Sequence, residues 1–256
     1  MSGTIFLPGI TVPAHVAYAP LLAELGPSTQ LVAKELEVYA GDRPPDGYGL
    51  DLEVEGLHRF ATAHGFDRFH LYGHSLGGAI ALAYLARYGD RVASVALNEP
   101  ATDFSAADRD AIAAEGLADV PDRERMQRFV RQLVRPGVEL GPPPPPTGDP
   151  EMAKRPAGVA AAIPAVDAHH VEADDLRRHP GPAYYGYGTL SNARWEAMAD
   201  RLPHVLRDCT VERYEGRHHL DAPHQAEPRR VAEALTRLWG RADAAGPDRQ
   251  GPQGPR

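Results

Sequence analysis

One short motif carries the residue types of a serine nucleophile. Residues 73–77 read Gly-His-Ser-Leu-Gly, which matches the pattern G-x-S-x-G with Ser75 at its centre. A short apolar run over residues 69–72 predicts a buried strand before the motif, and residues 79–88 predict a helix after it. On such a sharp turn the residues two before and two after the serine must be small, because the strand and helix backbones approach closely there. We therefore predict that Ser75 is a nucleophile; the alternative is a decayed or purely structural turn.

The rest of the chain predicts the elements that hold this turn. Short Val/Leu-rich runs alternate with longer helical patterns, which is typical of an α/β fold whose mostly parallel sheet has helices on both faces. The 256 residues suffice for one such domain. Strands are expected at residues 4–7, 36–39, 69–72, 92–97, 182–187 and 210–214. Helices are expected at residues 50–61, 79–88, 122–134, 195–202 and 228–240.

The alternating pattern is interrupted between residues 101 and 180. Helical stretches flank a proline run, residues 142–146, which can join neither a helix nor a central strand. We predict that residues 1–100 and 181–240 form the core and that residues 101–180 form a small helical lid, or cap, inserted into it. An interdomain linker is the alternative. Residues 241–256 are rich in Gly, Pro, Asp and Arg, and a disordered tail is expected there.

The motif in this context resembles the α/β-hydrolase family, and the resemblance extends over about residues 4–240. It implies an oxyanion hole made of two backbone N–H groups, and Leu76 supplies the one that follows the nucleophile. The second donor follows the first strand, where family members carry H-G-x. This chain has Leu-Pro-Gly-Ile at residues 7–10, so Ile10 is the matching donor. Proline in place of histidine is compatible with this role, because the backbone does the binding.

The resemblance also implies the position of the catalytic base. In the family this histidine lies in a loop between the last strand and the C-terminal helix, here residues 215–220. The usual pattern aligns His219 with the base, and His218 is the alternative. A metal site is a further interpretation of the local cluster His218, His219, Asp221 and His224. We prefer hydrogen bonds that fold the loop, because no helical H-x-x-x-H frame is present; no metal or cofactor is expected.

The third member of the triad departs from the usual pattern. Most α/β-hydrolases carry the acid in a G-x-x-D sequence after the strand that follows the lid, but residues 188–192 read Gly-Thr-Leu-Ser-Asn, with Ser191 at the acid position. Some members take the acid from the end of an earlier strand, and Glu99 directly follows the strand expected at residues 92–97. The sequence Leu-Asn-Glu-Pro around Glu99 also resembles a bacterial group of these enzymes. We predict that Glu99 orients His219. The alternatives are Asp103, Asp221, an incomplete triad, and Glu99 as a mere helix N-terminal carboxylate.

These residues together predict the hydrolysis of an ester-like small molecule through an acyl-enzyme on Ser75. A serine nucleophile argues against dehalogenase or epoxide hydrolase chemistry, for which this fold uses aspartate. The residues expected to border the substrate are Gly9, His74, Met126, Phe129 and Val130. The alternative is that His74 is a buried packing residue and that Met126, Phe129 and Val130 pack the core of the lid. Because the acid is missing from its usual place, two rival functions stay open. One is a lyase, cyclase or acyltransferase on the same scaffold, and the other is a catalytically weak ligand-binding protein.

The composition of the chain indicates which classes of partner it binds. A net charge of −8 disfavours nucleic acid, and no apolar run reaches the roughly 20 residues that cross a bilayer. The N-terminal residues lack the features of a secretion signal, and the single Cys209 agrees with a reducing cytoplasm. Lysine is almost absent, whereas Arg, Ala, Pro and Gly abound, which is typical of GC-rich bacteria. We expect a cytoplasmic protein with a small-molecule substrate; its oligomeric state stays open.

Overall fold

A single parallel sheet organises the protein. The computed structural model describes residues 2–28, 30–102, 122–141 and 149–245. Within them six parallel strands follow one another across the sheet in the order β2-β1-β3-β4-β5-β6. The strands are β1 (Gly3–Leu7), β2 (Leu31–Ala33), β3 (Phe69–His74), β4 (Val92–Asn98), β5 (Ala183–Gly188) and β6 (Cys209–Tyr214). Every residue of β1, β3, β4 and β5 is buried, which requires cover on both faces of the sheet.

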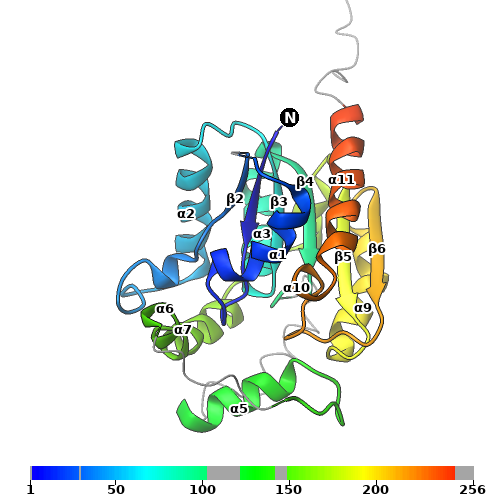
Figure 1. Ribbon diagram of the computed structural model, residues 1–256. Helices are drawn as coiled ribbons and strands as arrows, with labels where there is room; N and C mark the ends of the chain where they lie inside the picture. The colour runs from blue at the N-terminus through cyan, green and yellow to red at the C-terminus, as the bar shows by residue number, and fades with distance from the viewer. Residues whose placement is uncertain (1, 29, 103–121, 142–148, 246–256) are drawn as a thin grey trace, which may run out of the picture.

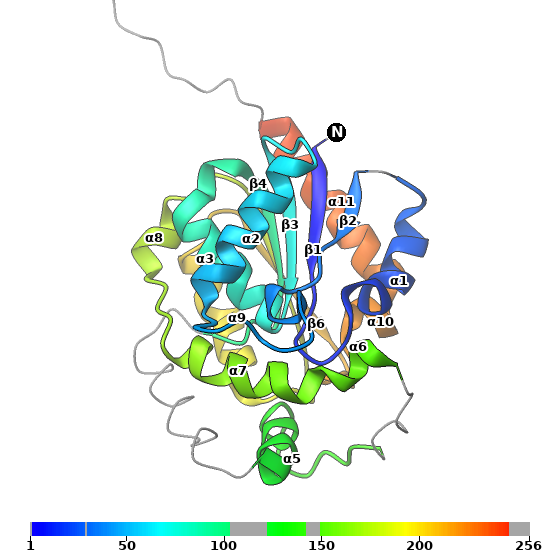
Figure 2. The same cartoon turned by 90° about the vertical axis from the view of Figure 1, so that its left-hand side faces the viewer.

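Helices provide that cover, so the predicted parallel sheet between two helical layers is confirmed (Figures 1 and 2). The layer on one face holds α2 (Leu50–Ala63), α3 (Leu76–Tyr88), α8 (Ala173–Arg177) and α9 (Ala193–Arg201). The layer on the other face holds α1 (Ala14–Leu25), α10 (Pro223–Ala226) and α11 (Pro228–Ala245). Each layer packs its apolar side chains against the sheet in a cluster of its own. No helix in the described ranges is long and apolar enough to span a membrane.

Two predicted elements differ from the structure, one in type and one in length. The strand expected at residues 36–39 is instead the 3₁₀ helix η1 (Glu37–Tyr39), and β2 lies earlier in the chain. The Glu53 carboxylate of α2 accepts the N–H groups of Glu37 at 2.8 Å and Val38 at 3.0 Å, so these donors need no neighbouring strand.

The last helix also extends further than predicted. Helix α11 continues through Gly240 to Ala245, so residues 241–245 do not belong to a tail. Ala242 is buried, and Arg241 donates hydrogen bonds to Asp208 and to the carbonyl of Ala183. This packing outweighs the weak helix propensity of one glycine. Residues 246–256 lie outside the described residues.

The described residues between β4 and β5 contain the helices α5 (Asp122–Gln132), α6 (Pro150–Ala153), α7 (Arg155–Asp167) and the short α8. Helices α5 and α7 lie beyond the carboxyl ends of the strands (Figure 1). Figure 1 shows α5 and α7 beneath the ends of the strands, and Figure 2 shows the same arrangement from the side. Helix α8 instead packs against α3 in the helical layer. The proline run at residues 142–146 lies outside the described residues. Helices α5 and α7 therefore lie at the same edge of the sheet as Ser75, which directly follows β3.

Candidate active site

Ser75 occupies the sharp turn between β3 and α3. Its backbone has φ 53° and ψ −118°, a conformation that costs energy for a residue with a side chain. A Cβ atom on Gly73 would overlap the backbone of Gly77, and one on Gly77 would overlap the carbonyl of Leu7. The Ser75 N–H donates to the carbonyl of Asn98 at 3.0 Å. Packing between neighbouring strands therefore maintains the strained turn, which presents the serine at the carboxyl edge of the sheet.

Three buried side chains from distant parts of the chain meet at this turn. His219 Nε2 lies 2.9 Å from Ser75 Oγ, and His219 Nδ1 lies 2.8 Å from Glu99 Oε2. Ser75 lies in the turn between β3 and α3, Glu99 follows β4, and His219 lies in the loop after β6. None is more than 5% exposed. The structure thus brings together the three residues that the sequence predicts as a triad, in the order nucleophile, imidazole and carboxylate.

The Glu99 carboxylate is held on both of its oxygens. Its Oε1 accepts the N–H of Gly188 at 2.6 Å, while Oε2 faces His219. Burial raises the pKa of Glu99, and the Gly188 N–H and the nearby Ser191 hydroxyl oppose that rise. Glu99 itself has φ 46°, a second strained position at this edge of the sheet. The usual place of the acid, after β5, has no carboxylate, and the end of β5 instead donates the Gly188 N–H to Glu99, which follows β4.

The imidazole of His219 is enclosed by aromatic rings. Trp195 stacks on it with ring centroids 4.3 Å apart and planes 7° from parallel, and the Trp195 indole N–H donates to the carbonyl of Pro100 at 2.8 Å. Burial lowers the pKa of His219 well below its ordinary value, and the positive charge of Arg194 acts in the same direction. A neutral imidazole is the form that can accept a proton. Sequence reasoning missed Trp195, because nothing near it in the sequence indicates a site.

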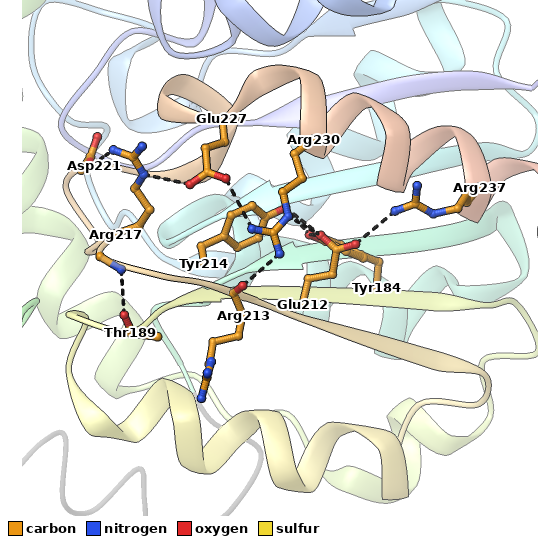
Figure 3. Close-up of polar contacts among 11 residues, drawn as sticks. Tyr184, Thr189, Glu212, Arg213, Tyr214, Arg217, Asp221, Glu227, Arg230 and Arg237 are labelled. Carbon is orange, nitrogen blue, oxygen red and sulfur yellow. Dashed lines mark hydrogen bonds and ion pairs between the residues drawn. The ribbon is translucent and has the colours of Figure 1, made fainter.

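A network of ion pairs fixes the loop that carries His219 (Figure 3). Arg217 binds Glu227 through Nε at 2.9 Å and Asp221 through Nη1 at 2.8 Å. The same loop is tied to the end of β5, because the Gly216 N–H donates to Thr189 Oγ1 at 2.9 Å. The network connects the loop to Glu227, the residue before α11, and to Thr189, the residue after β5. These contacts therefore restrain the backbone of the loop around His219.

The structure also bears on the alternatives that the sequence left open. Asp221 pairs with Arg217, and its N–H donates to His218 Nδ1 at 3.1 Å, so both residues take part in loop contacts. Asp103 lies outside the described residues. Within the described part of the chain no three His, Cys, Asp or Glu side chains are grouped in a way that would hold a metal ion. His224 instead packs against Tyr18, with ring centroids 4.9 Å apart.

The loop predicted to form the oxyanion hole is fixed through its carbonyl groups. The Tyr18 hydroxyl donates to Leu7 O at 2.5 Å, and the Tyr39 hydroxyl donates to Ile10 O at 2.7 Å. Ile10 and Leu76 border one cavity together with Ser75. Neither of their N–H groups has a hydrogen-bond partner among the described residues. Leu76 is the first residue of α3, where N–H groups lack intrahelical acceptors and favour negative charge.

Two cavities meet at Ser75, and together with the solvent space at their mouths they span about 690 Å³ and about 450 Å³. Of the predicted substrate contacts, Phe129 borders both cavities, and Gly9 and His74 border the smaller one. Met126 packs against the apolar core, and Val130 is not among the residues that line either cavity. Helix α7, which no motif singled out, provides much of the wall of the larger cavity.

Comparison with known proteins places this geometry in a wider context. Residues 40–146 match the family model of the alpha/beta hydrolase fold. No curated protein matches the sequence. Among solved structures, an esterase from Thermogutta terrifontis superposes with a TM-score of 0.69 at 19% identity, over 94% of this chain and 90% of that chain.

Two further structures show similar likeness. One comes from work on carboxylesterases of Nitrososphaera gargenis, with a TM-score of 0.69, 15% identity, and 96% and 92% of the two chains covered. The other is a carboxylesterase from Bacillus subtilis, with a TM-score of 0.65, 17% identity, and 93% and 84% covered. At such identities these likenesses establish a shared fold, and the chemistry must be argued from the residues of this chain.

Proposed function

The chain has the α/β-hydrolase fold, and on that premise we propose that it is a serine hydrolase that cleaves ester-like small molecules through an acyl-enzyme on Ser75. One observation carries the proposal. Ser75 Oγ, the His219 ring and the Glu99 carboxylate form a continuous chain of contacts at 2.9 and 2.8 Å. That arrangement has the geometry in which a base activates a hydroxyl and a carboxylate orients the base.

The first half-reaction follows from these positions. His219 Nε2 takes the proton of Ser75 Oγ as the oxygen attacks the carbonyl carbon, and the carbonyl oxygen becomes an oxyanion. The N–H groups of Ile10 and Leu76 donate to that oxyanion. When the tetrahedral intermediate collapses, the bond to the leaving oxygen breaks and His219 Nε2–H protonates that oxygen. Ser75 then carries the acyl group.

Water completes the cycle. His219 takes a proton from a water molecule, whose oxygen attacks the acyl carbon, and the proton returns to Ser75 Oγ as the carboxylic acid leaves. Glu99 keeps the Nδ1 proton on the side away from the serine and stabilises the imidazolium in both halves. Burial of the pair lowers the local dielectric, which strengthens these electrostatic interactions.

We further propose that the insertion of residues 101–180 acts as a cap over the nucleophile. Its helices α5 and α7 contribute Phe129, Val159, Ala162 and Val166 to the larger cavity beside Ser75. Apolar walls of this kind exclude water from the oxyanion and bind the apolar part of a substrate. The contact between Glu99 and His219 supports the hydrolase proposal over the rival functions, because it provides a triad acid although none follows β5.

A serine-directed fluorophosphonate probe and a panel of acyl esters test the proposal. We expect labelling of the wild-type protein at Ser75 and turnover of at least some esters, and loss of both in the Ser75→Ala variant. Circular dichroism of the variant serves as the check on its folding. A folded wild-type protein that neither takes the label nor cleaves any ester contradicts the proposal.

A further inference from the structure

The two cavities at Ser75 differ in chemistry. They share Ile10, Ser75, Phe129 and Leu133, so the nucleophile stands where they meet. The rest of the larger cavity is apolar except for Gln132, Asp167 and Arg194, and its apolar walls come from Leu76, Ala101, Val159, Ala162, Ile163 and Val166. The smaller cavity is the more polar one, because beside Val12, Ala17, Leu220 and Ala222 it has the polar side chains Thr11, His74, His219, His224 and Gln225. A substrate that reacts with Ser75 therefore has one part in an apolar compartment and the other part in a polar compartment.

The position of His219 decides which part goes where. The leaving oxygen must lie next to His219 Nε2, because that atom delivers the proton when the ester bond breaks. His219 borders only the smaller cavity, and the oxyanion donor Leu76 borders only the larger one. The leaving group accordingly belongs in the smaller, polar cavity. The acyl group belongs in the larger, apolar cavity.

His74 gives the leaving-group cavity a defined hydrogen-bond acceptor. Its Nδ1 lies 3.2 Å from the carbonyl oxygen of Asn98, and a carbonyl can only accept, so Nδ1 carries the proton. Burial, with a smaller contribution from His219, lowers the pKa of His74 to about 3. The ring is thus neutral at ordinary pH. Its Nε2 then has a lone pair and no hydrogen, and can act only as an acceptor.

The geometry directs that acceptor toward the cavity. The ring edge faces Gly9, another wall of the cavity, since a Cβ built there would lie 3.4 Å from His74 Nε2. His74 is only 8% exposed, and the one hydrogen bond of its ring in the described ranges is the contact of Nδ1 with Asn98. The ring packs between those of His219 and His224, with centroid distances of 4.8 and 4.9 Å. A phenyl ring could make the same packing contacts but would offer the cavity no acceptor.

We propose that the leaving group of the substrate carries a hydrogen-bond donor, a hydroxyl or N–H group close to the scissile bond, which His74 Nε2 accepts, while the acyl group is an apolar hydrocarbon chain. This inference rests on the proposed function, because the assignment of the cavities uses the proton transfer by His219. It defines the substrate class as esters of hydroxylated or amino alcohols with apolar acids.

Two esters with the same apolar acyl group test the inference. One is the 2-hydroxyethyl ester and the other is the propyl ester, which has nearly the same size but no donor. The quantity measured is the ratio of kcat/KM for the two esters, in the wild type and in the His74→Phe variant. Dividing one ratio by the other cancels the intrinsic reactivity of the two esters. We expect the wild-type ratio to exceed the variant ratio about 3- to 10-fold, the effect of one neutral hydrogen bond.

A second measurement needs no variant. The wild-type ratio divided by the ratio of the alkaline hydrolysis rates of the two esters in solution is expected to exceed 1. The His74→Phe protein is expected to fold, because the carbonyl of Asn98 keeps the Ser75 N–H as its donor. If that variant is nevertheless unfolded, the wild-type measurement alone decides.

The outcomes separate the inference from the function on which it rests. Turnover that depends on Ser75 but shows equal ratios in both proteins, or a corrected wild-type ratio of 1 or less, overturns the role of His74. Absence of any Ser75-dependent turnover overturns the proposed function instead. If the variant loses the same factor in kcat/KM for both esters, the ratios are again equal, and this result also counts against the inference.

Discussion

Replacing Glu99 by glutamine changes one atom at the centre of the proposed triad. Glu99 Oε1 accepts the Gly188 N–H at 2.6 Å, so the oxygen of the new amide must take that place. The amide NH₂ group then faces His219 Nδ1, at a position now 2.8 Å away, and donates to it. Nδ1 becomes an acceptor, Nε2 carries the proton, and His219 can no longer take the proton of Ser75.

The expected loss is large because the wrong tautomer blocks the base. The same change from carboxylate to amide in a protease triad lowers kcat about 10⁴-fold, and we expect a loss of that order here. This corresponds to about 5.4 kcal/mol of transition-state stabilisation. The thermal stability of the variant, unlike its activity, is not expected to fall. Burial raises the pKa of Glu99, so its charge destabilises the folded state at neutral pH, and the uncharged variant is expected to melt at the same or a higher temperature.

Steady-state kinetics on a reactive aryl ester, together with a thermal melt, measures both effects. Asp221→Asn is the matched control. It removes a carboxylate from the loop that carries His219, but this carboxylate pairs with Arg217 and not with His219. We expect that control to retain at least a tenth of the wild-type kcat. A Glu99→Gln protein with near wild-type turnover, particularly if Asp103→Asn is inactive, would refute the assignment of Glu99.

Further predictions concern groups around the triad. Tyr39→Phe removes the donor to the carbonyl of Ile10 and is expected to lower kcat about 3- to 10-fold with KM nearly unchanged, as steady-state kinetics will show. Ala162→Phe fills the larger cavity, so kcat/KM across an acyl-length series should fall about tenfold or more for the longest chains while short chains react normally. Gly188→Ala places a Cβ against the loop that carries His219 and should lower both the melting temperature and kcat. The acid limb of kcat/KM should lie below pH 6.5, since only neutral His219 acts as a base and burial lowers its pKa.

Local patterns in the sequence were sufficient to predict the turn that carries Ser75. The turn around Ser75 depends on small residues at fixed spacing between an apolar strand and a helix, and the structure has that strand, turn and helix. Helix α1 was missed although Ala14, Ala17, Tyr18 and Leu21 are buried at helical spacing. Pro20 inside the helix and the absence of a side-chain cap conceal this pattern from propensity rules.

Long-range partners were beyond sequence reasoning. Glu99 and His219 were suggested by resemblance, but Trp195 and Tyr39 belong to the site only because the fold places them against His219 and Ile10. Similarly, the 3₁₀ helix at Glu37–Tyr39 depends on a carboxylate from α2, which no window around those residues contains. Contacts of this kind are set by the packing of distant elements, so the sequence near each residue carries no sign of them.

Trapping the acyl-enzyme tests the central claim most directly. The wild-type protein is mixed with excess aryl ester, quenched in acid within the first turnovers, digested, and analysed by mass spectrometry. We predict one acyl group on the peptide that contains Ser75, and none in the Ser75→Ala protein. Sustained ester turnover without an acyl group on Ser75, or undiminished turnover by a folded Ser75→Ala protein, would contradict the account.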